Sequence, residues 1–402
     1  MATKIKYLNN LTPMRGVAAL LTVIFHVDIM IGQGGSMLVN HARSMLLSRM
    51  YLMVDFFFIL SGFIMFYVYG KIFSSSVTKE AFKKFSLARF ARVYPLHFVT
   101  LCYCILLYFI SQKVGIPKLP VVQIDNNSFS ILTNVLLLHS MNLHNYFTWN
   151  HASWSISVEW WAYMVFPFLV PPILAMGNNK KVIIAILCFV GYLVITFFII
   201  PIVTVPKEIP YAKINPDSLT INVAYEYGYI RCLCGFILGM MVYQAYCAQW
   251  LKKVLANGYV LICLVLASFV CMHFDLPDIL SVLPFPLILL CGAYGSIGID
   301  KFFAFKPLQR LGDWSFSIYL VHQPLILTLV SIRTYLNQMD HTNAAAGFPP
   351  KPEMFTGWLI CLGLILVTLV VSFLTYRFIE VPARNRLNGK RVPVTQLKAL
   401  QS

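Results

Sequence analysis

The sequence contains few charged residues and particularly few acidic ones. Asp, Glu, Lys and Arg make up 11% of its 402 positions, and only 15 residues are Asp or Glu. Hydrophobic residues make up 59% of the chain, and the mean hydropathy is +0.73. This composition argues against a water-soluble globular protein and is typical of a protein that crosses the membrane many times.

The ten cysteines form no C-x-x-C pair, and almost all of them lie within apolar runs. This pattern argues against a zinc site and a disulfide framework, and we expect the cysteines to be small buried hydrophobic residues. We therefore predict no metal and no permanently bound cofactor. No repeat at solenoid spacing is present, and no cleavable signal peptide precedes the first apolar run, which we interpret as a retained membrane anchor.

Ten apolar runs are long enough to cross about 30 Å of hydrocarbon as helices. They lie near residues 11–32, 50–70, 93–112, 153–175, 182–203, 228–246, 254–273, 279–299, 314–334 and 356–379. Another apolar stretch at 128–140 is too short to span and is expected to be re-entrant or interfacial. The sequence thus predicts an all-α transmembrane bundle in one domain (residues 1–385), followed by a short basic tail (386–402).

Lys and Arg are distributed unevenly between the loops on the two sides. With a cytoplasmic N-terminus and ten crossings, 20 of the 31 Lys and Arg residues fall on the inner side and seven on the outer side. An excess of cations in cytoplasmic loops fixes membrane orientation. We therefore predict that both termini are cytoplasmic in the plasma (inner) membrane, and that the net charge of +16 reflects topology rather than nucleic-acid binding.

The first apolar run carries both Arg15 and His26. They stand eleven positions apart, which is three helical turns plus about 20°, so both project from one face of the helix. Two such polar groups in a membrane span are costly unless they line a cavity. The structural alternative is an arginine that snorkels to the surface and a histidine that bonds to a neighbouring helix.

Four ionisable residues are expected near the outer ends of their spans: His26, Asp55, Glu159 and Arg231. A neutral imidazole can act as a general base towards a hydroxyl, and a carboxylate behind it would stabilise the imidazolium that forms. His26 with Glu159, or with Asp55, could supply this pair. The alternative is a network of ion pairs that only orients the helices.

Three arginines, Arg15, Arg89 and Arg92, are expected at the inner edge of the membrane. Guanidinium groups bind phosphate oxygens well, so a phosphorylated donor arriving from the cytoplasm would meet these three first. For Arg89 and Arg92 the alternative is a simple topology signal.

Small and polar residues also occur in the middle of two spans. Ser61-Gly62 would allow close helix approach, so packing alone explains it. Tyr319 and His322 share one helix face, and Pro324 should kink this helix and free backbone groups. A histidine at this depth is either a functional group or a packed core residue.

Taken in order, these motifs resemble the acyltransferase-3 family of membrane O-acyltransferases. The similarity rests on six stretches that follow the family's order along nearly the whole chain. They are Arg15-Gly16 through His26, VDFFFILSGF (54–63), RFARVYPLH (89–97), WSISVEWWAYMVFP (154–167), SFSIYLVHQP (315–324) and YRFIEVP (376–382).

The resemblance implies transfer of an acyl group, usually acetyl, from cytoplasmic acyl-CoA to a glycan hydroxyl at the outer side of the membrane. It implies His26 as the base and Glu159 as its catalytic companion. The donor- and substrate-binding residues expected on this basis are Arg15, Asp55, Ser61, Arg89, Arg92, Tyr94, Trp154, Ser155, Ser157, Tyr319 and His322. Some members carry a fused extracytoplasmic domain that this sequence lacks, so transfer would be direct or through a separate partner.

Two other kinds of function are compatible with the residues alone. Carboxylates and a histidine within the membrane could couple protons to transport of a lipid-linked sugar or small solute. Against this, the chain shows no inverted repeat with paired broken helices. The chain could also be a structural membrane subunit.

Overall fold

The computed structural model describes residues 8–32, 36–116, 126–203, 219–339 and 349–387, and these residues form helices and no strand. The prediction of an all-α fold is therefore confirmed. The helices are α1 (Leu11–Ile31), η1 (Leu47–Leu52), α2 (Met53–Tyr69), α3 (Lys79–Lys113), α5 (Ser128–Val135), η2 (His151–Ser153), α6 (Trp154–Ala175), α7 (Asn178–Val194), η3 (Ile195–Ile199), η4 (Ile200–Ile202), α8 (Gly228–Cys247), α9 (Lys252–Leu255), α10 (Gly258–His273), α11 (Asp278–Val282), α12 (Phe285–Tyr294), α13 (Ile297–Phe303), α14 (Lys306–Met339), α15 (Met354–Thr375), η7 (Tyr376–Glu380) and α16 (Val381–Leu387).

Each of the ten predicted runs forms one helix or a short series of consecutive helices. In the part of the chain that is described, eight helices are long and apolar enough to cross a membrane. The run at 279–299 is bent by 90° between Asp278–Tyr294 and Ile297–Phe303, and the run at 254–273 forms a helix of only 16 residues, α10. The stretch at 128–140 contains the eight-residue helix α5, which is too short to span.

Two helices extend well beyond their predicted inner ends. Helix α3 begins at Lys79 rather than near residue 93, with the Thr78 side chain accepting a hydrogen bond from the Ala81 amide. Helix α14 begins at Lys306 rather than near residue 314. The apolar pattern marks only the part of a helix inside the hydrocarbon, whereas a well-capped helix can continue into the basic interfacial region.

Contacts between loops agree with the predicted sidedness. On the side assigned as inner, Asn10 donates to Asp300 at 2.7 Å. On the side assigned as outer, the Asp28 carboxylate accepts from the Met37 amide at 2.9 Å, and Arg49 forms an ion pair with Asp278 at 3.1 Å. Which of the two sides faces the cytoplasm remains a prediction. Residues 388–402, most of the predicted basic tail, lie outside the described residues.

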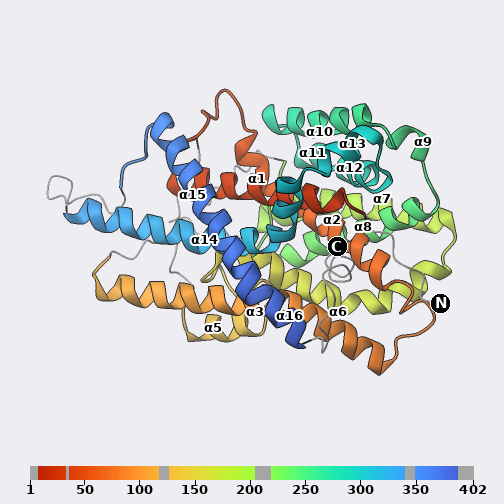
Figure 1. The fold of residues 1–402 in the computed structure, drawn as a ribbon, viewed down its shortest axis with the longest axis horizontal. Helices are drawn as coiled ribbons and strands as arrows, with labels where there is room; N and C mark the ends of the chain where they lie inside the picture. Colours follow the sequence, from red (N-terminus) through yellow and green to blue (C-terminus); the bar gives the residue numbers. More distant parts are fainter. Residues whose placement is uncertain (1–7, 33–35, 117–125, 204–218, 340–348, 388–402) are drawn as a thin grey trace.

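Helices α1 and α14 make the most extensive helix contact, and both lie between α10–α13 at one edge of the molecule and α3, α5 and α16 at the other (Figure 1). Two glycines allow their backbones to touch. A Cβ at Gly16 would lie 2.6 Å from the Gly312 amide nitrogen, and a Cβ at Gly312 would lie 2.1 Å from the Thr12 carbonyl oxygen. Any side chain at either position would push the two helices apart.

Helices α2 and α8 cross in the same manner. A Cβ at Gly62 would lie 1.9 Å from the Phe236 carbonyl oxygen, and a Cβ at Gly239 would lie 1.9 Å from the Ile59 carbonyl oxygen. The interpretation of Gly62 as a site of close helix approach agrees with this geometry.

A fully buried ion pair also joins α2 to α8. The Arg231 guanidinium donates to both carboxylate oxygens of Asp55, at 3.0 and 2.6 Å. It also donates to the backbone carbonyls of Val223 and Tyr51 and lies over the Trp154 ring at 5.6 Å. A buried pair with this many additional bonds compensates much of the cost of removing both charges from water.

Pro324 lies inside α14, and the predicted freeing of a backbone group is observed there. Because proline has no N–H, the carbonyl of Leu320 loses its partner within the helix. The Asn150 side-chain amide donates to this carbonyl at 3.0 Å. Pro324 thereby fixes the loop before η2 and α6 against the outer half of α14.

We predict that Gly62→Ala lowers the midpoint of heat unfolding in detergent, because its methyl group must displace the α8 backbone. The matched control is Gly363→Ala in α15, where a Cβ would meet nothing within 4 Å. This control should leave the midpoint unchanged or slightly raised, since alanine favours helix over glycine. Equal midpoints for the two variants would contradict the close contact of α2 with α8.

Candidate active site

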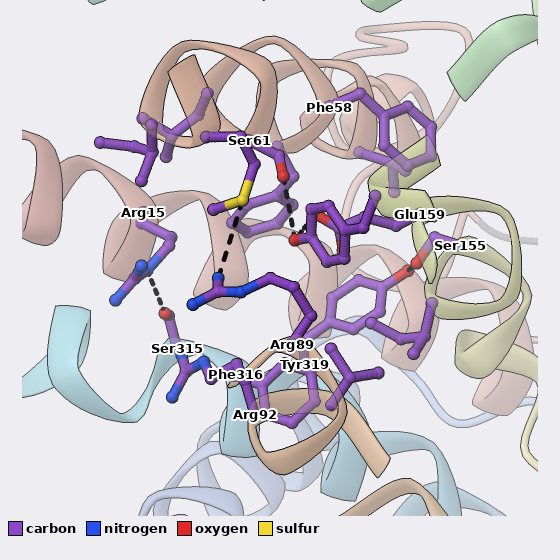
Figure 2. Close-up of a pocket in the computed structure, with 18 residues that line it drawn as sticks. Arg15, Phe58, Ser61, Arg89, Arg92, Ser155, Glu159, Ser315, Phe316 and Tyr319 are labelled. Atoms are coloured by element: carbon purple, nitrogen blue, oxygen red, sulfur yellow. Dashed lines mark hydrogen bonds between the residues drawn. The ribbon is translucent and has the colours of Figure 1, made fainter. Parts of the chain in front are cut away.

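A cavity lies among α1, α2, α3, α6 and α14, and its space together with the open space at its mouth amounts to about 870 Å³. Figure 2 shows polar side chains from all five helices pointing into it. Seven of the sequence-predicted site residues line it: Arg15, Ser61, Arg89, Arg92, Ser155, Glu159 and Tyr319. The lining of α2 runs from Val54 to Met65, a distance of about 16 Å along the helix.

Arginines from two helices lie at the end of the cavity on the side assigned as inner. The Arg15 guanidinium donates to the Ser315 hydroxyl at 2.7 Å and to the Gly312 carbonyl at 2.9 Å (Figure 2). Arg89 donates to the Tyr69 hydroxyl at 2.9 Å, and its guanidinium lies 5.1 Å from that ring.

Arg92, the third arginine at this end, forms an ion pair with Glu380 at 2.7 Å and lies over the Phe316 ring. The Glu380 carboxylate also accepts hydrogen bonds from the Ser317 hydroxyl and from Arg384. A cavity end with three guanidinium groups is suited to an anionic ligand such as a phosphate ester.

Towards its other end the cavity is lined by one carboxylate and several hydroxyl groups. Glu159 accepts a hydrogen bond from the Tyr163 hydroxyl at 2.6 Å, and that hydroxyl also lies 3.0 Å from Ser61 Oγ. Ser155 Oγ lies 2.7 Å from the Tyr319 hydroxyl (Figure 2). These hydrogen bonds join α2, α6 and α14 around a polar cavity inside an otherwise apolar bundle.

His26 and His322 form a contact just beyond Tyr319. His26 Nδ1 lies 2.9 Å from the Thr22 carbonyl oxygen and 3.2 Å from His322 Nε2. His322 Nδ1 lies 3.2 Å from the Ile318 carbonyl oxygen. Because a carbonyl only accepts, both rings carry their proton on Nδ1. His26 Nε2 is therefore the nitrogen with a lone pair, while His322 Nε2 accepts from His26.

The two histidines adjoin the cavity through Tyr319. The Tyr319 and His322 ring centroids are 5.8 Å apart, and the hydroxyl of Tyr319 points to Ser155 in the cavity wall. His26 is partly exposed, whereas His322 is fully buried. The arrangement places an imidazole that can accept a proton near one end of the cavity and the guanidinium groups at the other.

The structure corrects the predicted pairing of His26 with a carboxylate. Asp55 is bound to Arg231, and Glu159 is bound to Tyr163 in the same cavity as Arg89. Among the described residues, the contacts of His26 Nδ1 are to Thr22 and His322. Arg231 is fully buried and requires a counter-charge, which explains why it forms an ion pair with Asp55.

Three other expected site residues lie away from the cavity wall. Trp154 packs beneath the Arg231 guanidinium. Ser157 donates to the Leu137 carbonyl at 2.7 Å and so holds the loop before η2. The Tyr94 ring stacks on Phe90 with centroids 4.4 Å apart.

Sequence reasoning missed Tyr163, Ser315 and Glu380. Tyr163 follows Glu159 by four residues, a spacing at which two helical side chains meet. Ser315 and Glu380 lie within stretches already singled out, SFSIYLVHQP and YRFIEVP, but their partners on other helices could not be identified from one sequence. No group of three His, Cys, Asp or Glu side chains suited to a metal occurs among the described residues.

The chain is similar in sequence to known acyltransferases. The profile of a family described as an acyltransferase domain matches residues 8–377. The chain is 21% identical over 412 residues to a protein of Listeria monocytogenes named peptidoglycan O-acetyltransferase OatA, and the match covers 94% of this chain and 56% of that protein. It is 24% identical over 359 residues to a protein of Streptomyces mycarofaciens named acyltransferase MdmB, with 85% and 82% covered.

A shorter match is to the protein of Rhizobium radiobacter named protein 2 in picA locus, at 35% identity over 131 residues, with 31% of this chain and 61% of that protein covered. The chain thus spans less than two thirds of the Listeria and Rhizobium relatives. No solved structure matches it significantly.

We expect Glu380→Gln to lower the heat-unfolding midpoint substantially. The change removes the charge that Arg92 and Arg384 share, and leaving such a buried cation unpaired costs about 3 kcal/mol. Glu353→Gln, an exposed carboxylate at the start of α15, serves as the control and should have no effect. A midpoint for Glu380→Gln equal to that of this control would show that the ion pair contributes nothing to stability.

Proposed function

From the membership of this chain in the acyltransferase-3 family, and from the geometry of its cavity, we propose that it is a membrane O-acyltransferase. The proposed reaction moves an acyl group, acetyl in the first instance, from cytoplasmic acyl-CoA to a hydroxyl of an extracytoplasmic or lipid-linked glycan. The protein would lie in the plasma membrane with both termini in the cytoplasm.

The observation that carries this proposal is a single cavity with guanidinium groups at one end and an imidazole near the other. Arg15, Arg89 and Arg92 suit the phosphates of a CoA ester. The uncharged arm of the donor would then extend along α2 and bring its thioester towards Tyr319 and His26.

The tautomer of His26 supports its role as general base. Its Nδ1 proton is held by Thr22 and His322, so Nε2 can take the proton of an acceptor hydroxyl. The oxygen attacks the thioester carbonyl carbon as this proton leaves. When the C–S bond breaks, the imidazolium returns the proton to the CoA thiolate, so ester and thiol are the products.

Two further residues act by positioning in this proposal. His322 Nε2 accepts from His26 Nδ1 and stabilises the imidazolium that forms during the transfer. Glu159 orients the Tyr163 hydroxyl and places a negative charge near Arg89 and Arg92. This role differs from the carboxylate–imidazole pair expected from the sequence.

A glycan acceptor is supported by position and by the relatives. His26 is six residues from the predicted outer end of its helix, about 9 Å below the surface. An acceptor at the outer surface would therefore approach from the side opposite to the donor. The Listeria relative is named for O-acetylation of peptidoglycan, a glycan polymer.

We predict that His26→Ala lowers the rate of acyl transfer by about 10²- to 10⁴-fold, the usual contribution of a positioned general base. His322→Leu should lower it about tenfold and alter the pH profile, while His322→Gln, which keeps an acceptor, should recover part of the rate. His41→Ala, outside the spans, is the control. Full activity of His26→Ala in purified, folded protein would refute the mechanism.

The donor site can be tested without knowing the acceptor. Purified protein in nanodiscs is mixed with radiolabelled acetyl-CoA, and binding and slow CoA release are both followed. We expect Arg15→Ala to lose binding and His26→Ala to bind normally but release no CoA. Movement of a solute without consumption of acetyl-CoA would instead favour a transporter, and absence of CoA binding to the wild-type protein would remove the basis of the proposal.

A further inference from the structure

Arg384, on the C-terminal helix α16, is buried at the inner end of the bundle and is only partly satisfied. Its Nη2 donates to Glu380 Oε2 at 3.3 Å, and its Nε donates to the Glu380 backbone carbonyl at 3.3 Å. Its Nη1 is buried and has no hydrogen-bond partner among the described residues. The residue is 5% exposed, so water does not readily supply the missing hydrogen bond. An unsatisfied donor on a buried cation is costly and calls for an explanation.

The charges around Arg384 are unbalanced. Oxygen Oε2 of Glu380 is shared by two guanidinium groups, because Arg92 donates to it at 2.7 Å. The positive charges of Arg92 and Arg15 also repel Arg384. One carboxylate therefore faces two cations directly. Of the three arginines, Arg92 and Arg15 line the cavity.

The local backbone places this side chain beside Glu380 and Arg92, and Arg92 lines the cavity. Helix α15 ends in the π-helical turn η7, and the chain continues as α16, which packs against α3. Insertions of π-helix often occur at functional sites, since they rotate the following residues relative to the preceding helix. In Figure 1, α16 lies alongside α3, which carries Arg92. Leu366 and Val370 in α15 are exposed, whereas Glu380 and Arg384 are buried.

We propose that Arg384 binds a phosphate group of the donor nucleotide, together with Arg92, at the inner end of the cavity. The inference rests on the proposed acyl-CoA donor and extends it to a residue outside the cavity wall. A phosphate oxygen would satisfy the buried Nη1 donor and compensate the second positive charge, which Glu380 alone does not do. Charge-assisted bonds from guanidinium to phosphate are strong and directional.

The test compares binding of coenzyme A by three forms of the full chain in nanodiscs. The variants are Arg384→Ala and Arg386→Ala. Arg386 is exposed on the same helix, so the two variants remove the same charge. We expect Arg384→Ala to weaken coenzyme A binding about 10- to 100-fold, the usual effect of one lost bond to a charged group. Arg386→Ala should bind within about twofold of the wild type.

A phosphate-free donor separates binding from folding. S-acetylpantetheine carries the thioester and lacks the nucleotide, so its slow hydrolysis should be the same in Arg384→Ala and in the wild type. Equal coenzyme A affinity of wild type and Arg384→Ala would overturn the inference while leaving the proposed function standing. An equal loss with both donors would also overturn it, because it would show a purely structural role. Failure of the wild type to bind coenzyme A would overturn both.

Discussion

The contact between α1 and α14 is the constraint on which the rest of the site depends. Gly16 and Gly312 allow the two backbones to touch, and any side chain there would separate them. At this distance the Arg15 guanidinium reaches the Gly312 carbonyl and the Ser315 hydroxyl. Further along the same face, His26 reaches His322. One helix pair thus fixes both an arginine of the cavity and the proposed base.

The same contact determines the tautomer of His26, that is, which ring nitrogen carries the proton. A histidine whose Nδ1 faces only a carbonyl of its own helix could turn away, because nothing else would hold the ring. Here His322 supplies a second acceptor from the opposite helix, and its own Nδ1 is held by the Ile318 carbonyl. The two rings fix each other's tautomer, which leaves the lone pair of His26 on Nε2. A carboxylate is not needed for this.

Much of the fold could be predicted from the sequence, because hydropathy and helical periodicity are local properties. All ten apolar runs form helices, and the eleven-residue spacing placed Arg15 and His26 on one face, where both contact α14. The carbonyl freed by Pro324 was also expected from proline chemistry alone, although its partner Asn150 was not.

Partners on different helices could not be predicted in this way. Asp55 and His26 were expected in one outer layer. The order of the helices around the bundle instead places Asp55 against Arg231, and the two form an ion pair. Depth in the membrane follows from position along a span, whereas lateral neighbours depend on which helices pack together. Glu159 shows the same limit. Its depth was expected and its contact with Tyr163 follows from their spacing on α6, but its place near Arg89 follows from the packing of α6 against α3.

The inner end of the cavity shows how charge can reconcile stability with binding. Without Glu380, Arg92 and Arg384 would face each other across a buried space, and the C-terminal segment would be repelled from α3. With Glu380 the segment packs there, but a single carboxylate leaves one guanidinium nitrogen of Arg384 without a partner in the described part of the chain. A second carboxylate would satisfy it and would also repel an anionic ligand. One carboxylate between two arginines therefore holds the helix in place and leaves a net positive charge, which the proposed phosphate would compensate.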